Sequence, residues 1–292
     1  MDRSTVAVTG GNGKIGSAIV DHLSEYGYET VNISCGNRQE QRADSYITAN
    51  LLDAGDTYGA LAKADVDAVI HMGTIPDPYS HPDHTTYESN VLSAVHILEA
   101  CEALGIESVC LASSINAIGS EHQQRPAQIA YLPIDERHPR RPGDSYGIAK
   151  HAMEVTADGF GRRGSLTIAS LRYPWVATSS EIHDAFIDAD RSMAGLATAS
   201  DATTRDVLFS YLHIDDAATA ARCAIEATFG GHEPFWITAN DTTAAVPTDE
   251  LIETFYPDAT VETECTGHES LISCQKANEL LGWEPEYRWH DL

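Results

Sequence analysis

The sequence predicts an α/β fold in which a doubly wound parallel sheet is followed by a smaller C-terminal lobe. A glycine-rich segment, Thr9–Gly16, directly follows the short apolar run Val6–Val8. Short β-branched runs then alternate with amphipathic stretches through the first half of the chain. With 292 residues, 42% of them hydrophobic, the chain is also long enough to bury a substantial core.

Each expected element has a local signal. The run at 6–8 predicts the first strand, and 15–26 predicts a helix because Ile15, Ile19 and Leu23 share one face. In chain order, the other expected elements are strands at 30–33, 46–49, 66–71, 109–112 and 166–171, with helices at 85–104 and 144–161. Such alternation implies a Rossmann-like parallel sheet with helices on both faces and ligands at the carboxyl ends of its strands.

The regular alternation ends after residue 172. Residues 173–206 are rich in Ala, Ser, Thr and Asp, and an apolar segment near 209–216 leads into a helix that reaches residue 227. We therefore expect residues 1–172 to form a dinucleotide-binding domain, to which part of 207–240 returns. Residues 173–292 are expected to form mainly a substrate-binding lobe.

The charge balance is strongly acidic. The chain has 44 Asp and Glu residues against 18 Lys and Arg residues, which gives a formal net charge of -26. Repulsion on this scale is screened at molar salt, so the composition favours a salt-adapted protein of an extreme halophile; an acidic mesophilic protein is the alternative. Nucleic acid is not expected as a partner, because no basic face is visible.

No membrane, secretion or metal signal stands out. No apolar run reaches the roughly 20 residues that span a bilayer, and the N-terminus does not read as a signal peptide, so we expect a cytoplasmic enzyme. The six cysteines form no Cys-x-x-Cys pair and suit a reducing compartment. No metal site is expected.

The glycine-rich segment predicts a dinucleotide site. Gly10, Gly13 and Gly16 allow a tight turn and a close approach of the backbone to a pyrophosphate. Lys14 and Ile15 open the following helix, whose N-terminus supplies N–H donors. A plain glycine-rich turn is the alternative, and the placement between a strand and a helix argues against it.

The end of the second strand favours NADP over NAD. An acidic residue there would accept hydrogen bonds from the ribose 2′-hydroxyl, and 33–38 contains none. Ser34 can instead donate to a 2′-phosphate, and Arg38 can pair with it. The alternative is that Arg38 is a solvated loop residue and that both cofactors bind.

Three further residues predict proton transfer. Tyr146 and Lys150 are four residues apart, so they share one helix face. A neighbouring ammonium and an oxidised nicotinamide are expected to lower the pKa of the Tyr146 phenol and make it a general acid/base. Ser114, at the end of the fifth strand, could orient the substrate oxygen. An exposed Tyr/Lys helix face is the alternative.

These motifs and several others occur together. The matching stretches are Thr9–Gly16, His71-Met72-Gly73, Asn90, Ser114 five residues before Gly119, Tyr146 with Lys150, and Lys276–Pro285. On them the chain resembles, over essentially its whole length, the extended short-chain dehydrogenase/reductase family, also called the NAD-dependent epimerase/dehydratase family. Within it, the segment Ala112–Gly119 looks most like the sugar 1-dehydrogenase branch, which includes uronate dehydrogenases and archaeal aldose dehydrogenases.

The resemblance implies further site residues. Asn50 and Leu51 would flank the adenine, and Met72, Gly73 and Asn90 would lie at the cofactor. The residues implied at the substrate are Thr74, Ser114, Asn116, Tyr146, Trp175 and Arg205. For Trp175 a core or interface aromatic is the alternative, and for Arg205 a structural salt bridge.

Some positions depart from the related uronate enzymes. Those enzymes carry Asn-His after the catalytic serine, where this chain has Ile115-Asn116, and Pro76 replaces a substrate-contacting serine. The Asp-Glu pair of sugar-nucleotide dehydratases is absent, and Ala117-Ile118-Gly119 stands where epimerases commonly have Val-Tyr-Gly. A plain dehydrogenase fits best.

The sequence thus leads to an NADP-preferring aldose 1-dehydrogenase that forms a lactone. The resemblance suggests L-arabinose or another pentose or hexose, with D-galactose, D-xylose, glucose 6-phosphate and uronates as rivals. A nucleotide-sugar 4-epimerase and a non-catalytic NADP-binding sensor are the alternatives. The resemblance also implies a homo-oligomer, a dimer or tetramer, formed through the helices at 85–104 and 144–161.

Overall fold

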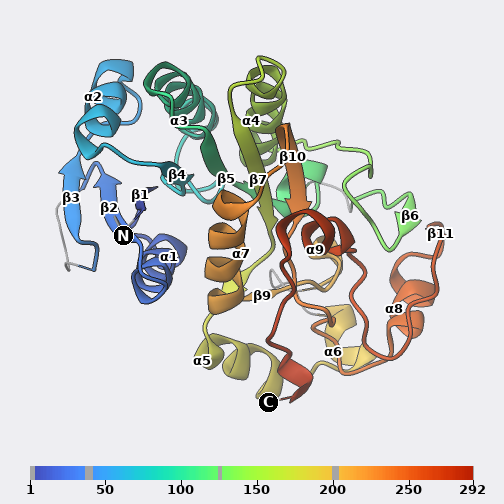
Figure 1. Cartoon of the computed structure of the whole chain (residues 1–292). Helices are drawn as coiled ribbons and strands as arrows, with labels where there is room; N and C mark the ends of the chain where they lie inside the picture. The colour runs from blue at the N-terminus through green and yellow to red at the C-terminus, as the bar shows by residue number, and fades with distance from the viewer. Residues whose placement is uncertain (1–3, 37–41, 124–126, 199–203, 292) are drawn as a thin grey trace.

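The computed structural model describes residues 4–36, 42–123, 127–198 and 204–291, and its centre is a seven-stranded parallel sheet (Figure 1). The strand order is β10-β7-β5-β4-β1-β2-β3. The strands are β1 (Thr5–Thr9), β2 (Glu29–Ser34), β3 (Ser45–Thr48), β4 (Ala68–His71), β5 (Ser108–Ser114), β7 (Thr167–Tyr173) and β10 (Gly231–Trp236). Every adjacent pair is parallel. The predicted doubly wound sheet is confirmed.

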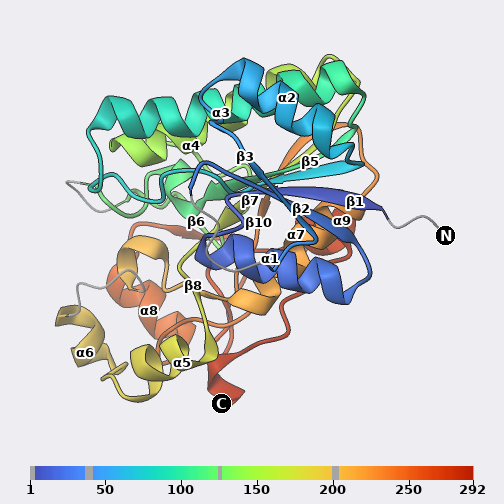
Figure 2. The same cartoon turned by 90° about the vertical axis from the view of Figure 1, so that its left-hand side faces the viewer.

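Helices cover both faces of this sheet, as Figure 2 shows. The helices of one face are α2 (Ala54–Ala64), α3 (Asp83–Leu104) and α4 (Ser145–Gly161), and those of the other are α1 (Lys14–Glu25), α7 (Ile214–Glu226) and α9 (Gln275–Leu281). The periodic residues Ile19, Val20 and Leu23 of α1 are fully buried against the sheet. Burial on both faces explains why β4 and β5 read as continuous apolar runs.

Three of these elements, α2, β10 and α9, are absent from the sequence-based expectation, and α2 and β10 carry weak sequence signals. Helix α2 contains two glycines, and only Thr57, Ala60 and Leu61 of its residues are buried. Strand β10 contains Pro234, which a sheet tolerates at an edge, and β10 is the edge strand beside β7. Neither α2 nor β10 has the dense apolar pattern by which the predicted elements can be recognised.

A second group of elements gathers beyond the carboxyl ends of the strands (Figures 1 and 2). It consists of β6 (Tyr131–Leu132), β8 (Val176–Ala177), α5 (Ser179–Ile182), α6 (Met193–Thr198), β9 (Leu212–His213), α8 (Thr248–Phe255) and β11 (Thr260–Val261). Short parallel pairings, β8 with β9 and β6 with β11, hold it together. Among the described residues, no helix is long and apolar enough to cross a membrane.

Candidate active site

The glycine-rich turn between β1 and α1 has no room for a side chain at Gly10 or Gly16. Gly10 has a left-handed φ of +66°, and a Cβ atom there would lie 2.8 Å from the Cα atom of Gly73. A Cβ atom on Gly16 would lie 2.3 Å from the carbonyl oxygen of Gly10. Gly13 caps α1 and is exposed. The turn therefore leaves the helix N-terminus open to an anionic group, as a dinucleotide pyrophosphate requires.

Two adjoining cavities follow this turn along the strand ends. One, of about 690 Å³, is lined by Ser34, Asn50, Leu51 and Gly73, and the other, of about 420 Å³, by Ser114, Tyr146 and Lys150. The residues that line both are Gly10, Gly13, Met72 and Thr74. The two cavities thus form a continuous cleft, with the shape that an extended dinucleotide and a small substrate need.

The end of β2 presents hydroxyl and amide groups to the larger cavity. The Ser34 hydroxyl donates to Oδ1 of Asn32 at 2.8 Å, and Nδ2 of Asn32 donates to Oδ1 of Asn12 at 2.9 Å. No Asp or Glu occurs among the described residues that line this cavity. Arg38 lies outside the described residues.

Three cofactor residues implied by the family resemblance have different positions. Asn50 is exposed at the cavity wall, where its Oδ1 accepts from the Leu52 amide at 3.2 Å, and Leu51 lines the same wall. Asn90 is fully buried and lines neither cavity. Its Oδ1 atom accepts from the Ile75 backbone N–H at 2.8 Å, and its Nδ2 atom donates to the Ile75 carbonyl at 3.0 Å. Asn90 thus fixes the loop after β4, and its direct contact with a cofactor stays a prediction.

The two ends of the candidate catalytic group come from β5 and α4. Ser114 ends β5, and its Oγ accepts from the Asn116 amide at 3.1 Å. Asp144 caps α4 by accepting from the Gly147 amide at 2.8 Å, which sets Tyr146 and Lys150 on the first two turns. All three candidate catalytic residues line the smaller cavity.

Lys150 is held by two oxygens. Its Nζ donates to the Ala112 carbonyl at 2.7 Å and to Oγ1 of Thr74 at 3.0 Å, and it lies 5.5 Å from the centroid of the Tyr146 ring. Thr74 therefore contacts the candidate catalytic lysine while lining the cavity. Burial lowers the pKa of Lys150 to about 7, against the opposing charge of Glu154.

The pKa of Tyr146 is raised in the cofactor-free protein. Burial raises it to about 12, a hydrogen bond with Ser114 acts the other way, and the carboxylates of Glu121, Asp144 and Asp77 raise it further. Desolvation thus disfavours the phenolate in the cofactor-free protein, and the lowering expected beside an oxidised nicotinamide stays a prediction.

The substrate residues implied by the resemblance divide into two groups. Asn116 and Trp175 line the smaller cavity, and the Trp175 ring lies edge-on to Phe186 with centroids 5.8 Å apart. Arg205 is exposed and borders a separate pocket beside Phe255. Its carbonyl accepts from the Tyr256 hydroxyl at 2.5 Å, and Tyr256 lines that same separate pocket. The structure thus does not bring Arg205 to Tyr146.

These arrangements agree with the comparison to known sequence families. The model of the "NAD dependent epimerase/dehydratase family" matches residues 6–237. The chain belongs to this family. The predicted enzyme class, dependent on a nicotinamide dinucleotide, is thereby confirmed.

Relatives within the epimerase/dehydratase family have different names. A UDP-glucose 4-epimerase of Rhizobium leguminosarum is 27% identical over 98% of this chain and 94% of its own length. A uronate dehydrogenase of Pseudomonas putida is also 27% identical, over 56% of this chain and 58% of its own length. The solved UDP-glucose 4-epimerase of Thermus thermophilus, in complex with NAD, has a TM-score of 0.67 at 23% identity over 97% and 94% of the two chains. That likeness shows the shared fold.

Two cavity residues have no motif in the sequence analysis. Glu121 and His122 follow the short 3-10 helix Ile115–Ile118 and line the smaller cavity beside Tyr146. The His122 ring is edge-on to the Tyr146 ring, with centroids 6.5 Å apart. Only the distance of two to three residues from Gly119 could have drawn attention to them.

Lys14 links the glycine-rich turn to β8 and α5 of the second group of elements. Its Nζ donates to the Val176 carbonyl at 2.9 Å and to Glu181 at 2.5 Å, and it lies 5.9 Å from the centroid of the Trp175 ring. Both Lys14 and Glu181 are partly exposed, so the ion pair alone adds little stability. Lys14 is itself the first residue of α1, beside the exposed N-terminus of this helix.

A buried ion network connects α4 to β5, the strand that ends at Ser114. Glu154 of α4 accepts from the Ser113 hydroxyl at 2.6 Å, from Arg172 at 2.7 and 2.9 Å, and from Arg140 at 2.8 Å. Burial acts to raise the pKa of Glu154, but these partners outweigh it and lower the pKa to about 2. The network thereby fixes α4 against the carboxyl ends of β5 and β7.

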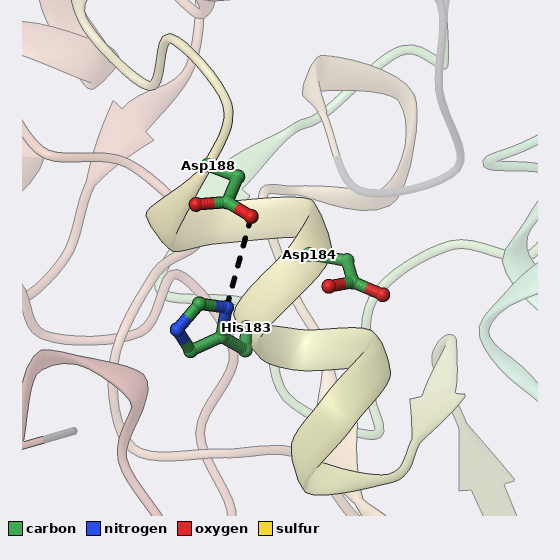
Figure 3. Close-up of side chains that lie close together, drawn as sticks. All are labelled: His183, Asp184 and Asp188. Carbon is green, nitrogen blue, oxygen red and sulfur yellow. Dashed lines mark ion pairs between the residues drawn. The ribbon is translucent and has the colours of Figure 1, made fainter.

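One surface group has metal-binding residue types. His183, Asp184 and Asp188 of the turn that follows α5 are exposed, with one possible ligand atom each within 4.8 Å of the others. Figure 3 shows His183 and Asp188 facing each other, and their Nδ1 and Oδ2 atoms are 3.9 Å apart. Such exposed pairs are common on acidic surfaces, and the group lines neither cavity of the cleft.

Proposed function

We propose that the chain is an NADP-preferring sugar 1-dehydrogenase that oxidises an aldose, such as L-arabinose or a related pentose or hexose, at C1. The observation that carries this proposal is the meeting of Ser114, Tyr146 and Lys150 around one small cavity that continues into the dinucleotide cleft. A hydroxyl donor, a proton acceptor and a lysine at one point suit removal of a proton from a carbinol.

The chemistry assigns each group one task. The Ser114 hydroxyl orients the anomeric oxygen, and Tyr146 removes its proton as the carbon–oxygen double bond of the lactone forms. The oxidised nicotinamide, when bound, supplies the hydride acceptor and a positive charge. That charge compensates for the desolvation that raises the pKa of Tyr146 in the cofactor-free protein. Lys150 holds the nicotinamide ribose and keeps Thr74 in place.

The preference for NADP rests on the end of β2. Ser34 lines the larger cavity, and no carboxylate is present among the described lining residues to accept from a ribose 2′-hydroxyl or to repel a 2′-phosphate. Related structures bind NAD. We therefore propose that kcat/KM is higher with NADP than with NAD, and that NAD is also accepted.

A nucleotide-sugar 4-epimerase is the second candidate. It is supported by relatives that carry this name and align with nearly the whole chain. The two activities differ in their cofactor balance, because an epimerase returns the hydride to the same sugar and releases no reduced cofactor.

Initial rates of NADPH and NADH formation test the proposal. The purified protein is assayed in molar KCl with free pentoses, hexoses, uronates and phosphosugars, beside Tyr146→Phe as a matched variant. We expect NADPH formation with one group of aldoses, and a loss of at least about a hundredfold in Tyr146→Phe with unchanged NADP affinity. Full activity of the variant would contradict the assigned role of Tyr146.

We also propose a homodimer through α3 and α4. These helices pack against each other and expose the apolar side chains Tyr87, Leu92, Ile148 and Val155. Light scattering tests this: a dimer is expected for the native chain, and Val155→Glu should weaken it. A monomer at all concentrations would contradict the proposal.

A further inference from the structure

Glu121 has a defined position in the smaller cavity, although the assigned proton transfer does not use it. Asn116 holds it from two sides. Its Oδ1 accepts from the Glu121 amide at 2.8 Å and from the Ser120 hydroxyl at 3.1 Å, while its amide group also bonds the Glu121 carboxylate. The Glu121 side chain is 28% exposed. Its carboxylate therefore borders the cavity with a fixed backbone and with accepting capacity to spare.

His122 fixes the other side of this carboxylate. Its φ of +63° lies in the left-handed region, which is rarely adopted by residues other than glycine and is concentrated at functional sites. The conformation places the imidazole edge-on between Tyr146 and Tyr79, at centroid distances of 6.5 and 5.1 Å, with its Nε2 atom 3.6 Å from the Glu121 carboxylate. Glu121, His122 and Tyr146 thus form one wall.

The electrostatic potential at this wall is negative. Glu121, Asp144 and Asp77 raise the pKa of Tyr146. Burial raises the pKa of Glu121, His122 and Asn116 oppose this, and Asp206 adds to it. The lysine and arginine side chains among the described lining residues are Lys14 and Lys150. Lys14 contacts Glu181, Lys150 contacts Thr74 and Ala112, and Arg205 lies outside the cavity. A substrate carboxylate or phosphate at this wall would meet carboxylates without a lysine or arginine of its own.

We infer that Glu121, positioned by Asn116 and His122, is the residue that determines substrate charge: its carboxylate accepts hydrogen bonds from the hydroxyls of a neutral monosaccharide and repels anionic sugars. This inference rests on the proposed sugar dehydrogenase function and narrows its substrate class. It also separates this chain from relatives named for uronates and for a nucleotide diphosphate sugar, whose substrates carry negative charge. Recognition by a carboxylate is strong because hydrogen bonds to a charged acceptor are the stronger class.

Three sugars isolate the charge effect. L-Arabinose, D-galactose and D-galacturonate share one pyranose stereochemistry and differ in the substituent on C5, which is hydrogen, hydroxymethyl or carboxylate. We measure kcat/KM for each, with NADP and at one KCl concentration. The variants are Glu121→Gln, which removes the charge and keeps the shape, and Asp184→Asn, which makes the same charge change on the exposed surface.

The native enzyme is expected to favour the better neutral sugar over galacturonate by at least about a hundredfold. Glu121→Gln should lower that ratio at least about tenfold, partly by raising kcat/KM for galacturonate, with the KM for NADP unchanged. Asp184→Asn should leave the ratio unchanged. A native enzyme that oxidises galacturonate as well as galactose, or an unchanged ratio in Glu121→Gln, would overturn the inference while the dehydrogenase function stands.

Failure of the proposed function gives a different result. Epimerisation of a nucleotide sugar without NADPH formation from any free sugar would overturn both, because the bound substrate would then be a diphosphate. A binding measurement needs no turnover. With NADP present, the melting temperature of Tyr146→Phe should rise with galactose or arabinose and not with galacturonate, and stabilisation by galacturonate alone would overturn the charge selection.

Discussion

The Nδ1 atom of His71 lies 2.7 Å from the Oγ1 atom of Thr9, at the point where β1 meets the glycine-rich turn. The same Oγ1 accepts from the amides of Met72 and Gly73, both at 3.1 Å. The Thr9 hydroxyl therefore donates its own proton to Nδ1 of His71. His71 therefore carries its proton on Nε2, which donates to Ser93 at 3.0 Å. A neutral histidine thus fastens the loop that separates the two cavities.

The His71 pair makes stability depend on pH. Burial, with the charge of Lys150, lowers the pKa of His71 from 6.5 to about 3. Between these values the unfolded chain binds a proton that the folded chain does not, so the free energy of unfolding falls as pH falls below 6.5. Each pH unit costs up to about 1.4 kcal/mol. Urea titrations at several pH values give the free energy of unfolding as a function of pH. This free energy should fall less steeply with decreasing pH in His71→Asn than in the native protein, and an equal pH dependence would contradict a neutral buried histidine.

Tyr146 should titrate differently with and without cofactor. The pKa of about 12 predicts no tyrosinate from Tyr146 near pH 10 in the cofactor-free protein. Oxidised NADP should lower that pKa, because its positive nicotinamide stabilises the phenolate. Ultraviolet difference spectra between the native protein and Tyr146→Phe measure this residue alone. If saturating NADP leaves the difference spectrum unchanged, the nicotinamide is not what activates the phenol.

Cofactor choice should depend on Ser34. A carboxylate introduced by Ser34→Asp would accept from a ribose 2′-hydroxyl and repel a 2′-phosphate. We expect the NADP to NAD ratio of kcat/KM to fall at least about tenfold, measured with the same sugar. Cys35→Ser, at the exposed neighbouring position, should leave the ratio unchanged. An unaltered ratio in Ser34→Asp would show that a residue other than Ser34 determines the cofactor preference.

The buried Glu154 network should contribute strongly to stability. Both Glu154 and Arg172 have fully buried side chains, so Glu154→Gln leaves an uncompensated guanidinium. The expected loss is about 3 to 5 kcal/mol in the free energy of unfolding. Glu102→Gln, which breaks a partly exposed pair with Arg163, should cost no more than about 1 kcal/mol. Denaturant titrations compare the two, and equal losses would show that Arg172 finds another partner.

Local patterns were enough to predict the frame of the site. The glycine-rich turn, the strand that ends at Ser114 and the helix that carries Tyr146 and Lys150 each follow from residues close together in the chain. Because carboxyl ends of parallel strands meet at one sheet edge, these segments come together once the alternation is recognised.

The remaining features depend on tertiary contacts. Arg205 borders a separate pocket, and two consecutive left-handed residues, Leu208 and Phe209, follow it where no spacing rule indicates them. The bonds of Asn90 to Ile75 need the folded loop, and the pKa of Tyr146 depends on burial that composition cannot show. Glu121 and His122 gain meaning only from the wall that they form with Tyr146.

The most direct test of the account is the stoichiometry of reduced cofactor. The protein is incubated in molar KCl with limiting L-arabinose or D-galactose and excess NADP, and in parallel with UDP-galactose, and NADPH and sugar products are quantified. A sugar 1-dehydrogenase should form one NADPH and one lactone for each aldose consumed, and no UDP-glucose. Interconversion of the two nucleotide sugars with no net NADPH would contradict it and identify an epimerase.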